Sequence, residues 1–411
     1  MSIDAQVYLV INRFDDEFGE YHRFVDQSVC QLAYITVQDG LAVLDQSRAC
    51  KTVVLPSLDF DAVLPAARRI AQQVGGLGGI VGLSEYDLLT AAQLREAMSL
   101  PGYPVALVRH FKDKLIMKKA VANAGLRTPR YRAIEPCTSA DELISDFGLP
   151  MILKPRNGAA SLGVVLVWDR PELIAALAEV PLADYECEEY IRGDILHVDG
   201  IRRQGRYHFV SVSCYINTCL DFAGGRPLGS VVLDPGPRVE AAAKFAGDCL
   251  DALGLQDGPF HLELFEEPSG DLIFLEVGLR PGGGEIPFIH RDLFGIDLFC
   301  EAFRASLGLP AATCPDDLAR PAGGGFVMVP EPRPFPSRVT SRSSLRGAVP
   351  GVYREIIPAV GEVFDGTGGY EHIGGRFHLR GINQDDVTRT VHEVIARYEL
   401  AAEAVAPVGP R

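Results

Sequence analysis

The chain has 411 residues, 47% apolar and 23% charged, a composition typical of folded proteins with two to four domains rather than of disordered or fibrous chains. Its 54 acidic and 39 basic residues give a formal net charge of −15, which disfavours nucleic acid and anionic membranes as general partners. No apolar run reaches the roughly 18 residues needed to span a bilayer, and the N-terminus lacks signal-peptide features. The nine cysteines form no CxxC pair, so we expect a reduced, cytoplasmic protein.

The N-terminal part of the chain, up to residue 108, alternates strand-like and helix-like segments. The predicted strands are 5–11, 32–37, 52–56 and 79–83, and the predicted helices are 61–76 and 86–100. This alternation predicts a small parallel sheet wrapped by helices. No GxGxxG motif follows the first strand, so we expect a scaffold role here rather than a dinucleotide site.

The pattern changes after residue 110. A helix is predicted to begin near residue 111 and to end at Gly125, shortly before Pro129. A β-hairpin is predicted to turn at Gln204-Gly205. Further predicted helices are 171–180, 239–255 and 385–400, and further strands are 150–155, 163–168, 324–330 and 375–381.

The segment 258–287 predicts a second hairpin, in which two glutamates face each other. A two-residue turn at Ser269-Gly270 would place Glu263 opposite Glu276. Side-chain alternation would then put these residues on one face: His261, Glu263, Phe274, Glu276, Gly278 and Arg280.

Two carboxylates opposite each other, with Cβ atoms about 5 Å apart, destabilise a sheet unless something offsets their repulsion. A shared proton or Arg280 would do so in part. A divalent cation such as Mg²⁺, which takes oxygen ligands, would do so more fully. The alternative is a solvated acidic hairpin tip, but Glu263 and Glu276 lie in mid-strand, away from the turn.

A loop of small residues, 155–163, follows Lys154 at the end of a predicted strand. Small residues let backbone N–H groups approach an anion, and the Ser161 hydroxyl adds a donor. Lys154 would supply a point charge to the phosphates of a nucleotide. Many hairpins carry such a loop, and this one does not match the pattern GxxxxGK[ST], so a P-loop fold is not implied.

An acidic segment, Glu188, Glu189, Tyr190 and Ile191, joins a predicted strand to the next subdomain. Its backbone groups could read the edge of an adenine, with Tyr190 or Ile191 packing on the ring. An acidic surface linker is the alternative.

Taken together and in this order, these motifs resemble the ATP-grasp superfamily over about residues 110–300. The family pattern runs from an Asp-Lys pair that opens a helix, through a Lys-Pro strand end, a small-residue loop and an acidic hinge, to two metal-binding glutamates and an arginine. The matching positions here are Asp113-Lys114, Lys154-Pro155, 156–163, 188–191, and Glu263, Glu276 and Arg280. Five matches in order are far more specific than any one of them.

The resemblance implies an α/β fold of the ATP-grasp type, with an N-terminal doubly wound domain (1–108), a small subdomain (109–187), a central subdomain (188–320) and a C-terminal biotin-carboxylase-like lobe (321–411). ATP and Mg²⁺, with Mn²⁺ as an alternative, are the implied cofactors. The implied roles are phosphate binding by Lys114 and Lys154, adenine binding by Glu188 and residues 189–191, metal binding by Glu263 and Glu276, and catalysis by Arg280, which would steady the acyl phosphate and the tetrahedral intermediate.

One position departs from the family pattern, because Gly278 stands where an asparagine usually completes the metal ligands. The run EVGLRPGGG looks more like the amino-acid ligase branch, which joins two amino acids and often has glycine there. One ligand fewer would loosen a second metal. The ribose ligand stays open among Asp194, His197 and Asp199, and His197 could equally be an ordinary strand residue.

The sequence therefore predicts an ADP-forming carboxylate–amine ligase acting on small molecules, with amino acids as the first expectation. Homodimers are common in the family and are one expected assembly. A biotin-carboxylase-like enzyme that activates bicarbonate is an alternative, although the chain has no MKM-type carrier segment. An inert nucleotide-binding regulator is the other alternative.

Overall fold

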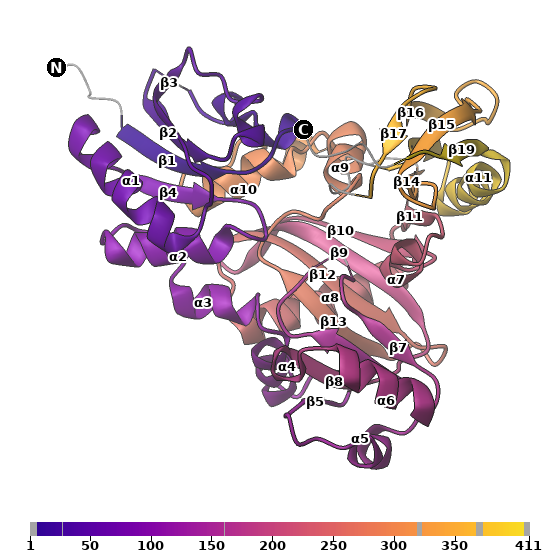
Figure 1. Cartoon of the computed structure of the whole chain (residues 1–411). Coiled ribbons are helices and arrows are strands. Elements are labelled where there is room, and N and C mark those ends of the chain that lie inside the picture. Colours follow the sequence, from indigo (N-terminus) through magenta and orange to yellow (C-terminus); the bar gives the residue numbers. More distant parts are fainter. Residues whose placement is uncertain (1–5, 27, 160, 319–322, 367–372, 407–411) are drawn as a thin grey trace.

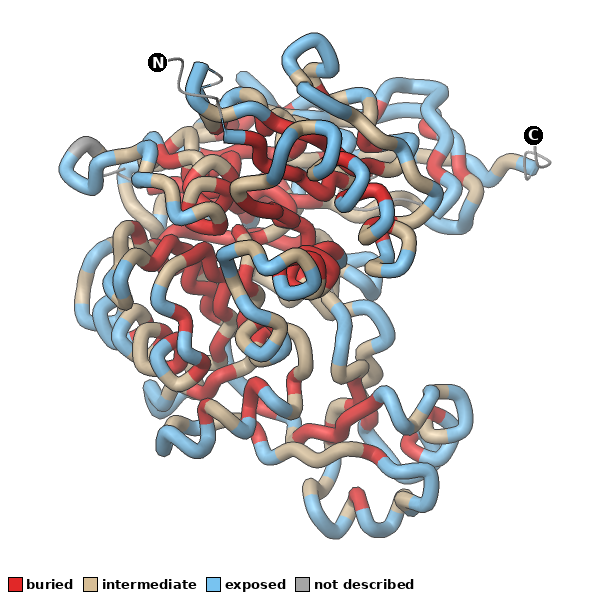
Figure 2. Tube along the Cα trace, turned by 90° about the vertical axis from the view of Figure 1, so that its left-hand side faces the viewer, coloured by how far each residue is buried: buried red, intermediate tan, exposed pale blue. Residues whose placement is uncertain are grey.

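The computed structural model describes residues 6–26, 28–159, 161–318, 323–366 and 373–406. Within these ranges the chain forms four β-sheets with helices packed around them (Figure 1). Buried residues concentrate in a large body, and a smaller lobe with its own core projects below it (Figure 2). The predicted α/β fold class is confirmed, whereas the domain boundaries at 108, 187 and 320 remain predictions.

The N-terminal sheet is parallel, as predicted, and both of its faces are covered. Its spatial order is β3 (Ala49–Val54), β2 (Cys30–Thr36), β1 (Gln6–Asn12) and β4 (Gly79–Gly82). The predicted helices α1 (Phe60–Val74) and α2 (Leu88–Ala97) cover one face, where Val63 and Ile70 contribute to a buried apolar cluster. On the other face lies α10 (Leu298–Ser306), which is distant in sequence and contributes Phe299 and Phe303.

The small lobe is built on an antiparallel sheet with the order β5 (Tyr131–Ala133), β8 (Tyr185–Glu189), β6 (Met151–Pro155) and β7 (Val165–Val167). The helices α5 (Ala140–Phe147) and α6 (Arg170–Glu179) pack on its apolar face. Because strand side chains alternate, the opposite face carries Lys154, Glu186 and Glu188.

The third sheet has eight antiparallel strands, and one of its faces contributes to a large apolar core. Its order is β13 (Leu272–Gly278), β12 (Gly258–Glu266), β9 (Asp194–Arg203), β10 (Arg206–Ile216), β11 (Leu228–Val232), β14 (Gly323–Val329), β18 (Gly375–Gly381) and β16 (Val352–Ile356). Helix α8 (Pro237–Leu253) packs on it, together with α4 (Lys114–Asn123). The strands predicted at 324–330 and 375–381 therefore pair and extend this sheet.

The remaining elements complete the C-terminal part and the connections. The fourth sheet has the order β17 (Val363–Phe364), β15 (Ser337–Arg342) and β19 (Leu400–Ala404), and α11 (Gln384–Arg397) packs beside β14. Other helices are α3 (Val105–His110), α7 (Cys219–Ala223) and α9 (Ile286–Phe294). Short 3-10 helices occupy Glu17–Gly19, Tyr21–Arg23, Asp39–Leu41, Leu182–Asp184 and Pro315–Asp317.

The β12–β13 hairpin pairs Glu263 with Glu276, as predicted, but it reaches this register in a different way. Its turn encloses three residues, because the N–H of Glu267 donates to the carbonyl of Asp271 and that of Gly270 donates to Glu267. This longer turn shifts the pairing by one residue, and a bulge after Glu263 shifts it back.

Between the turn and the bulge the predicted faces are therefore inverted. Phe274 pairs with Leu264 and is fully buried in the core, so the prediction that Phe274 shares a face with Glu276 is wrong. Leu275 lies beside Glu276 on the wall of a cavity instead.

The bulge makes Phe274 a core residue, and this can be tested by mutation. Phe274→Ala is expected to lower the free energy of unfolding by about 3–5 kcal/mol, because it leaves a cavity among tightly packed apolar side chains. Urea unfolding followed by circular dichroism measures this. Leu275→Ala is the matched control, and an equal loss for both variants would contradict the register.

Candidate nucleotide and metal site

A cavity of about 260 Å³ lies between the small sheet and the β12–β13 hairpin. Most of the residues singled out from the sequence line it: Lys114, Lys154, Ser161, Glu188, Glu189, Tyr190, Ile191, Glu263 and Glu276. His197 and Arg280 are not among its lining residues. A larger cavity of about 650 Å³ lies near Gly79 and Gly102 and contains none of the predicted residues, so chemistry rather than size locates the site.

Glu263 and Glu276 face each other across the hairpin and lie on the cavity wall. The hydroxyl of Tyr215 donates to Glu263 Oε1 at 3.1 Å, and Lys114 Nζ lies 3.3 Å from Glu276 Oε2. Burial disfavours the ionised form of Glu276, but the ammonium groups of Lys114 and Lys154 lower its pKa overall. The pair thus presents hard oxygen atoms, the ligand type that a divalent cation takes, beside an ammonium group that already neutralises part of their charge.

Lys114 stands in the first turn of α4, and the sequence there explains its position. The carboxylate of Asp113 accepts hydrogen bonds from the backbone N–H groups of Leu115 and Ile116, which caps the helix. The same carboxylate pairs with Arg156 at 2.6 Å. Lys114 Nζ also donates to the carbonyl of Gly158 at 3.0 Å. The small-residue loop is therefore tied to the helix start, and both meet at the cavity.

Lys154 belongs to a buried charge cluster, which we define as Lys118, Lys154, Glu186 and Glu188. All four side chains are at most 5% exposed. Lys154 Nζ lies 2.8 Å from Glu188 Oε1, and the ammonium of Lys118 donates to both glutamates. Burial opposes the charge of Glu188, but Lys154 and Lys118 lower its pKa to about 2.

Two members of this cluster were not predicted from the sequence. Lys118 lies one helical turn after Lys114, and Glu186 lies two residues before Glu188 on the same strand face. Those spacings are the sequence signals that could have placed Lys118 and Glu186 beside the predicted residues. The side chain of Glu188 pairs with two ammonium groups, those of Lys118 and Lys154.

The hinge segment borders the same cavity. Glu189 pairs with Arg130 at 2.6 Å, and its backbone N–H donates to the carbonyl of Arg130 at 3.0 Å, so its carboxylate and its N–H are both engaged. Ile191 is buried, whereas Tyr190 is 36% exposed and its ring centroid lies 6.0 Å from that of Trp168. The segment thus offers an apolar surface and backbone polar groups, as adenine recognition requires.

Arg280 is held by a residue of the loop that follows β4 in the N-terminal part of the chain. Its Nε donates to Glu85 Oε2 at 2.9 Å, and Lys112 Nζ lies 2.7 Å from the other oxygen of the same carboxylate. A Cβ at Gly278 would lie 3.5 Å from Glu85 Oε2. The sequence did not indicate Glu85, because nothing local to the loop after β4 reveals a partner 195 residues away.

Comparison with known proteins agrees with this geometry. A family profile described as an ATP-grasp domain matches residues 111–253. This chain carries an ATP-grasp domain. The matched region begins just before Asp113-Lys114 and includes the small lobe and the acidic hinge.

Among curated relatives, the chain is 26% identical to an L-arginine-specific L-amino acid ligase of Bacillus subtilis over 271 residues, 63% of this chain and 64% of that protein. It is also 26% identical to a D-alanine–D-alanine ligase of Anaeromyxobacter sp. strain Fw109-5, over 64% of this chain and 88% of the relative. The chain thus spans less than two thirds of the length of the first of these relatives.

Solved structures share the whole fold. The crystal structure of an L-amino acid ligase from Bacillus licheniformis superposes with a TM-score of 0.76 at 19% identity, covering 96% of this chain and 98% of that one. The biotin carboxylase domain of a Hydrogenobacter thermophilus 2-oxoglutarate carboxylase, solved with MgADP, gives a TM-score of 0.68 at 15% identity, with coverage of 97% and 91%. At these identities the likeness establishes the ATP-grasp architecture alone.

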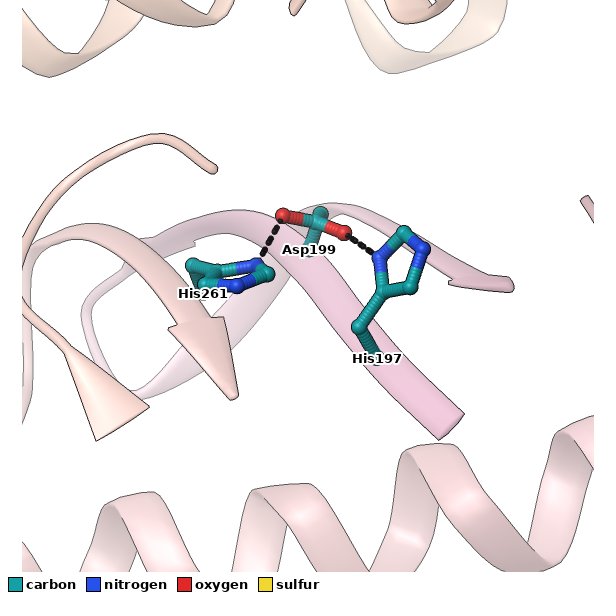
Figure 3. A group of neighbouring side chains, drawn as sticks. All are labelled: His197, Asp199 and His261. Carbon is teal, nitrogen blue, oxygen red and sulfur yellow. Dashed lines mark hydrogen bonds and ion pairs between the residues drawn. The ribbon is translucent and has the colours of Figure 1, made fainter. Parts of the chain in front are cut away.

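His197, a ribose-ligand candidate, is not among the lining residues of the 260 Å³ cavity, although it pairs with Glu263 and its ring stacks on Tyr215, which both line that cavity. Its Nδ1 lies 2.5 Å from Asp199 Oδ2, and its Nε2 lies 2.7 Å from the hydroxyl of Ser230. His261 binds the other oxygen of Asp199 at 2.8 Å (Figure 3). Both ring nitrogens of His197 are thus engaged in the described structure, and its role as a ribose ligand stays a prediction.

A metal site is a second interpretation of His197, Asp199 and His261, since their ligand atoms lie within 4.8 Å of one another. Hydrogen bonds within the group already satisfy them. Burial disfavours a charged His261, but Asp199 raises its pKa to about 9. His261 Nε2 lies 3.4 Å from Glu263, so the group steadies one of the two cavity glutamates.

Over the described ranges of the chain, none of the helices combines the length and the apolar character needed to cross a lipid bilayer.

Proposed function

We propose that this protein is an ATP-dependent carboxylate–amine ligase. The observation that carries the proposal is the pairing of Glu263 with Glu276 on a cavity wall that also holds Lys114 and Lys154. Two ammonium groups suit the phosphates of a nucleoside triphosphate, and two carboxylates suit the divalent cation that accompanies it. The matched ATP-grasp domain supports the same reading.

Most of the predicted residues have a role in the proposed reaction. Lys114 and Lys154 bind and orient the phosphates, the backbone of 189–191 receives the adenine, and the loop after Lys154 keeps water out. Glu263 and Glu276 would hold Mg²⁺ or Mn²⁺, which supplies charge neutralisation at the phosphates. A substrate carboxylate oxygen attacks the γ-phosphorus and ADP leaves; an amine then attacks the acyl carbon, and phosphate leaves as the amine loses a proton.

Arg280 is proposed as the catalytic residue of the second half of the reaction. An arginine presents several N–H donors in a fixed geometry that matches an oxyanion or a phosphate. Glu85, which is itself paired with Lys112, holds this side chain from one side. Its role would be to stabilise the negative charge of the acyl phosphate and of the tetrahedral intermediate.

Amino acids are the proposed substrates. Two relatives with long alignments are named as ligases of amino acids, and their identities are equal at 26%.

We further propose that the enzyme is cytoplasmic and that its domains meet at residues 108, 187 and 320. We also propose that it forms a homodimer, and light scattering after gel filtration measures this assembly.

A phosphate-release screen tests the proposed function. The purified chain with ATP and Mg²⁺ is offered amino acids singly and in pairs, and products are identified by mass spectrometry. We expect ADP, phosphate and an amide product in equal amounts with at least one pair. ADP formation that depends only on bicarbonate would favour the biotin-carboxylase-like alternative, and nucleotide binding without any ADP formation would favour the inert regulator.

Lys154→Met is expected to raise the KM for ATP by about 10- to 100-fold, because a charge-assisted hydrogen bond to phosphate is worth roughly 1.5–3 kcal/mol. Initial rates at varied ATP measure this. Lys51→Met, which removes a lysine from the N-terminal sheet, is the control. An unchanged KM for ATP would remove Lys154 from the nucleotide site.

A further inference from the structure

The buried charge cluster contains an ammonium group that the proposed reaction does not use. Lys154 lines the nucleotide cavity, but Lys118 is 0% exposed and is absent from the cavity wall. The cluster holds two lysines and two glutamates, so its formal charges cancel. A buried lysine that cannot reach a ligand needs a reason, because removing an ammonium group from water is costly.

The contacts within the buried charge cluster suggest why Lys118 is buried there. Glu188 has two ammonium partners, Lys154 and Lys118, and only Lys154 can also face the cavity. Lys154 approaches Glu186 only to 3.9 Å, whereas Lys118 donates to Glu186 at 2.5 Å. Lys118 also lies 5.0 Å from the centroid of the Tyr131 ring, which further fixes its position.

A nucleotide would compete with Glu188 for Lys154. Lys154 and Glu188 both line the cavity, so phosphates that bind Lys154 would draw its ammonium away from Glu188. If Glu188 had no other partner, this movement would leave a buried carboxylate without a countercharge, which is strongly unfavourable. The cost would appear directly as weaker binding of phosphate-bearing ligands.

We propose that Lys118 is a positioning residue for nucleotide binding, which keeps Glu188 compensated so that Lys154 is released to the phosphates. The inference rests on the proposed function, in which Lys154 binds ATP. Lys118 stays paired with both glutamates when phosphates bind. Lys154 is the member that exchanges partners.

The test compares a ligand that has phosphates with one that lacks them. Equilibrium dialysis measures the affinities for ADP and for adenosine in the wild type, in Lys118→Met and in the charge-balanced double variant Lys118→Met/Glu186→Gln. Lys119→Met is the matched control, because it makes the same change at the next, exposed position of α4. Thermal unfolding reports whether each variant folds.

We expect ADP affinity to fall by a factor on the order of 100 in both Lys118 variants, with adenosine affinity unchanged. The KM for ATP should rise by a similar factor while kcat at saturating ATP is retained. If Lys118→Met does not fold, the double variant still tests the inference. Its remaining buried charges, those of Lys154 and Glu188, cancel, so it avoids an uncompensated carboxylate.

Two results would overturn the inference. Wild-type ADP affinity in the double variant would mean that charge balance alone matters, and not the hold of Lys118 on Glu188. Equal losses for ADP and adenosine would mean general damage to the pocket. A wild type that binds no ADP would instead remove the proposed function itself, so the two failures are distinguishable.

Discussion

Replacing Glu276 with glutamine is expected to reduce ADP formation by a factor on the order of 1000 while leaving the fold intact. A divalent cation contributes several kcal/mol of charge stabilisation to phosphoryl transfer, and the amide cannot supply the anionic ligand that Glu276 offers. The substitution also removes a repulsion, because Glu263 lies directly opposite. Coupled assay of ADP measures the rate, and the melting temperature reports the fold.

A second readout separates the metal site from a general loss of activity. The wild type should gain thermal stability from ADP together with Mg²⁺, and Glu276→Gln should lose the part of that gain that depends on Mg²⁺. Asp271→Asn is the matched control, since it makes the same change at the exposed turn of the same hairpin. Normal turnover in Glu276→Gln would rule out the metal assignment.

Arg280→Met should lower kcat by about 100- to 1000-fold with little change in the KM for ATP. The loss follows because removing one donor from an oxyanion site typically costs this much and leaves nucleotide contacts intact. Hydroxylamine traps an acyl phosphate as a hydroxamate, so adding it shows which step has slowed. If the attack of the amine is affected, hydroxamate should still form in the variant.

The control for this experiment is Arg238→Met. Arg238 pairs with Glu266 at 2.5 Å and does not line the cavity, so its loss should leave kcat unchanged. Equal effects of the two substitutions on kcat, or a variant Arg280→Met with normal turnover, would argue that Arg280 has no part in the chemistry.

The hairpin shows how far sequence reasoning reached. Alternation of side chains and a Gly-containing turn were enough to pair Glu263 with Glu276. The prediction omitted two compensating deviations, a third turn residue and a bulge, which together restore the pairing but place Phe274 in the core. A bulge has no local sequence signature strong enough to recognise, because the packing of the whole sheet decides where it forms.

The buried charge cluster marks a second limit. Motif order located Lys114, Lys154 and Glu188, because each stands at a strand or helix end next to a recognisable loop. Lys118 and Glu186 stand within regular elements, where a charged residue ordinarily faces solvent. Only the packing of α4 on the small sheet turns them inward, and that packing depends on contacts far apart in the chain.

The contact between Lys114 and Glu276 has a consequence for the order in which ligands arrive. A bare divalent ion would have to displace an ammonium group that already neutralises the carboxylate, so it gains little by entering alone. Nucleotide phosphates give the lysine another anion and thereby free the carboxylate. Metal and nucleotide should accordingly enter as one complex, and rates should follow the concentration of that complex rather than of either component.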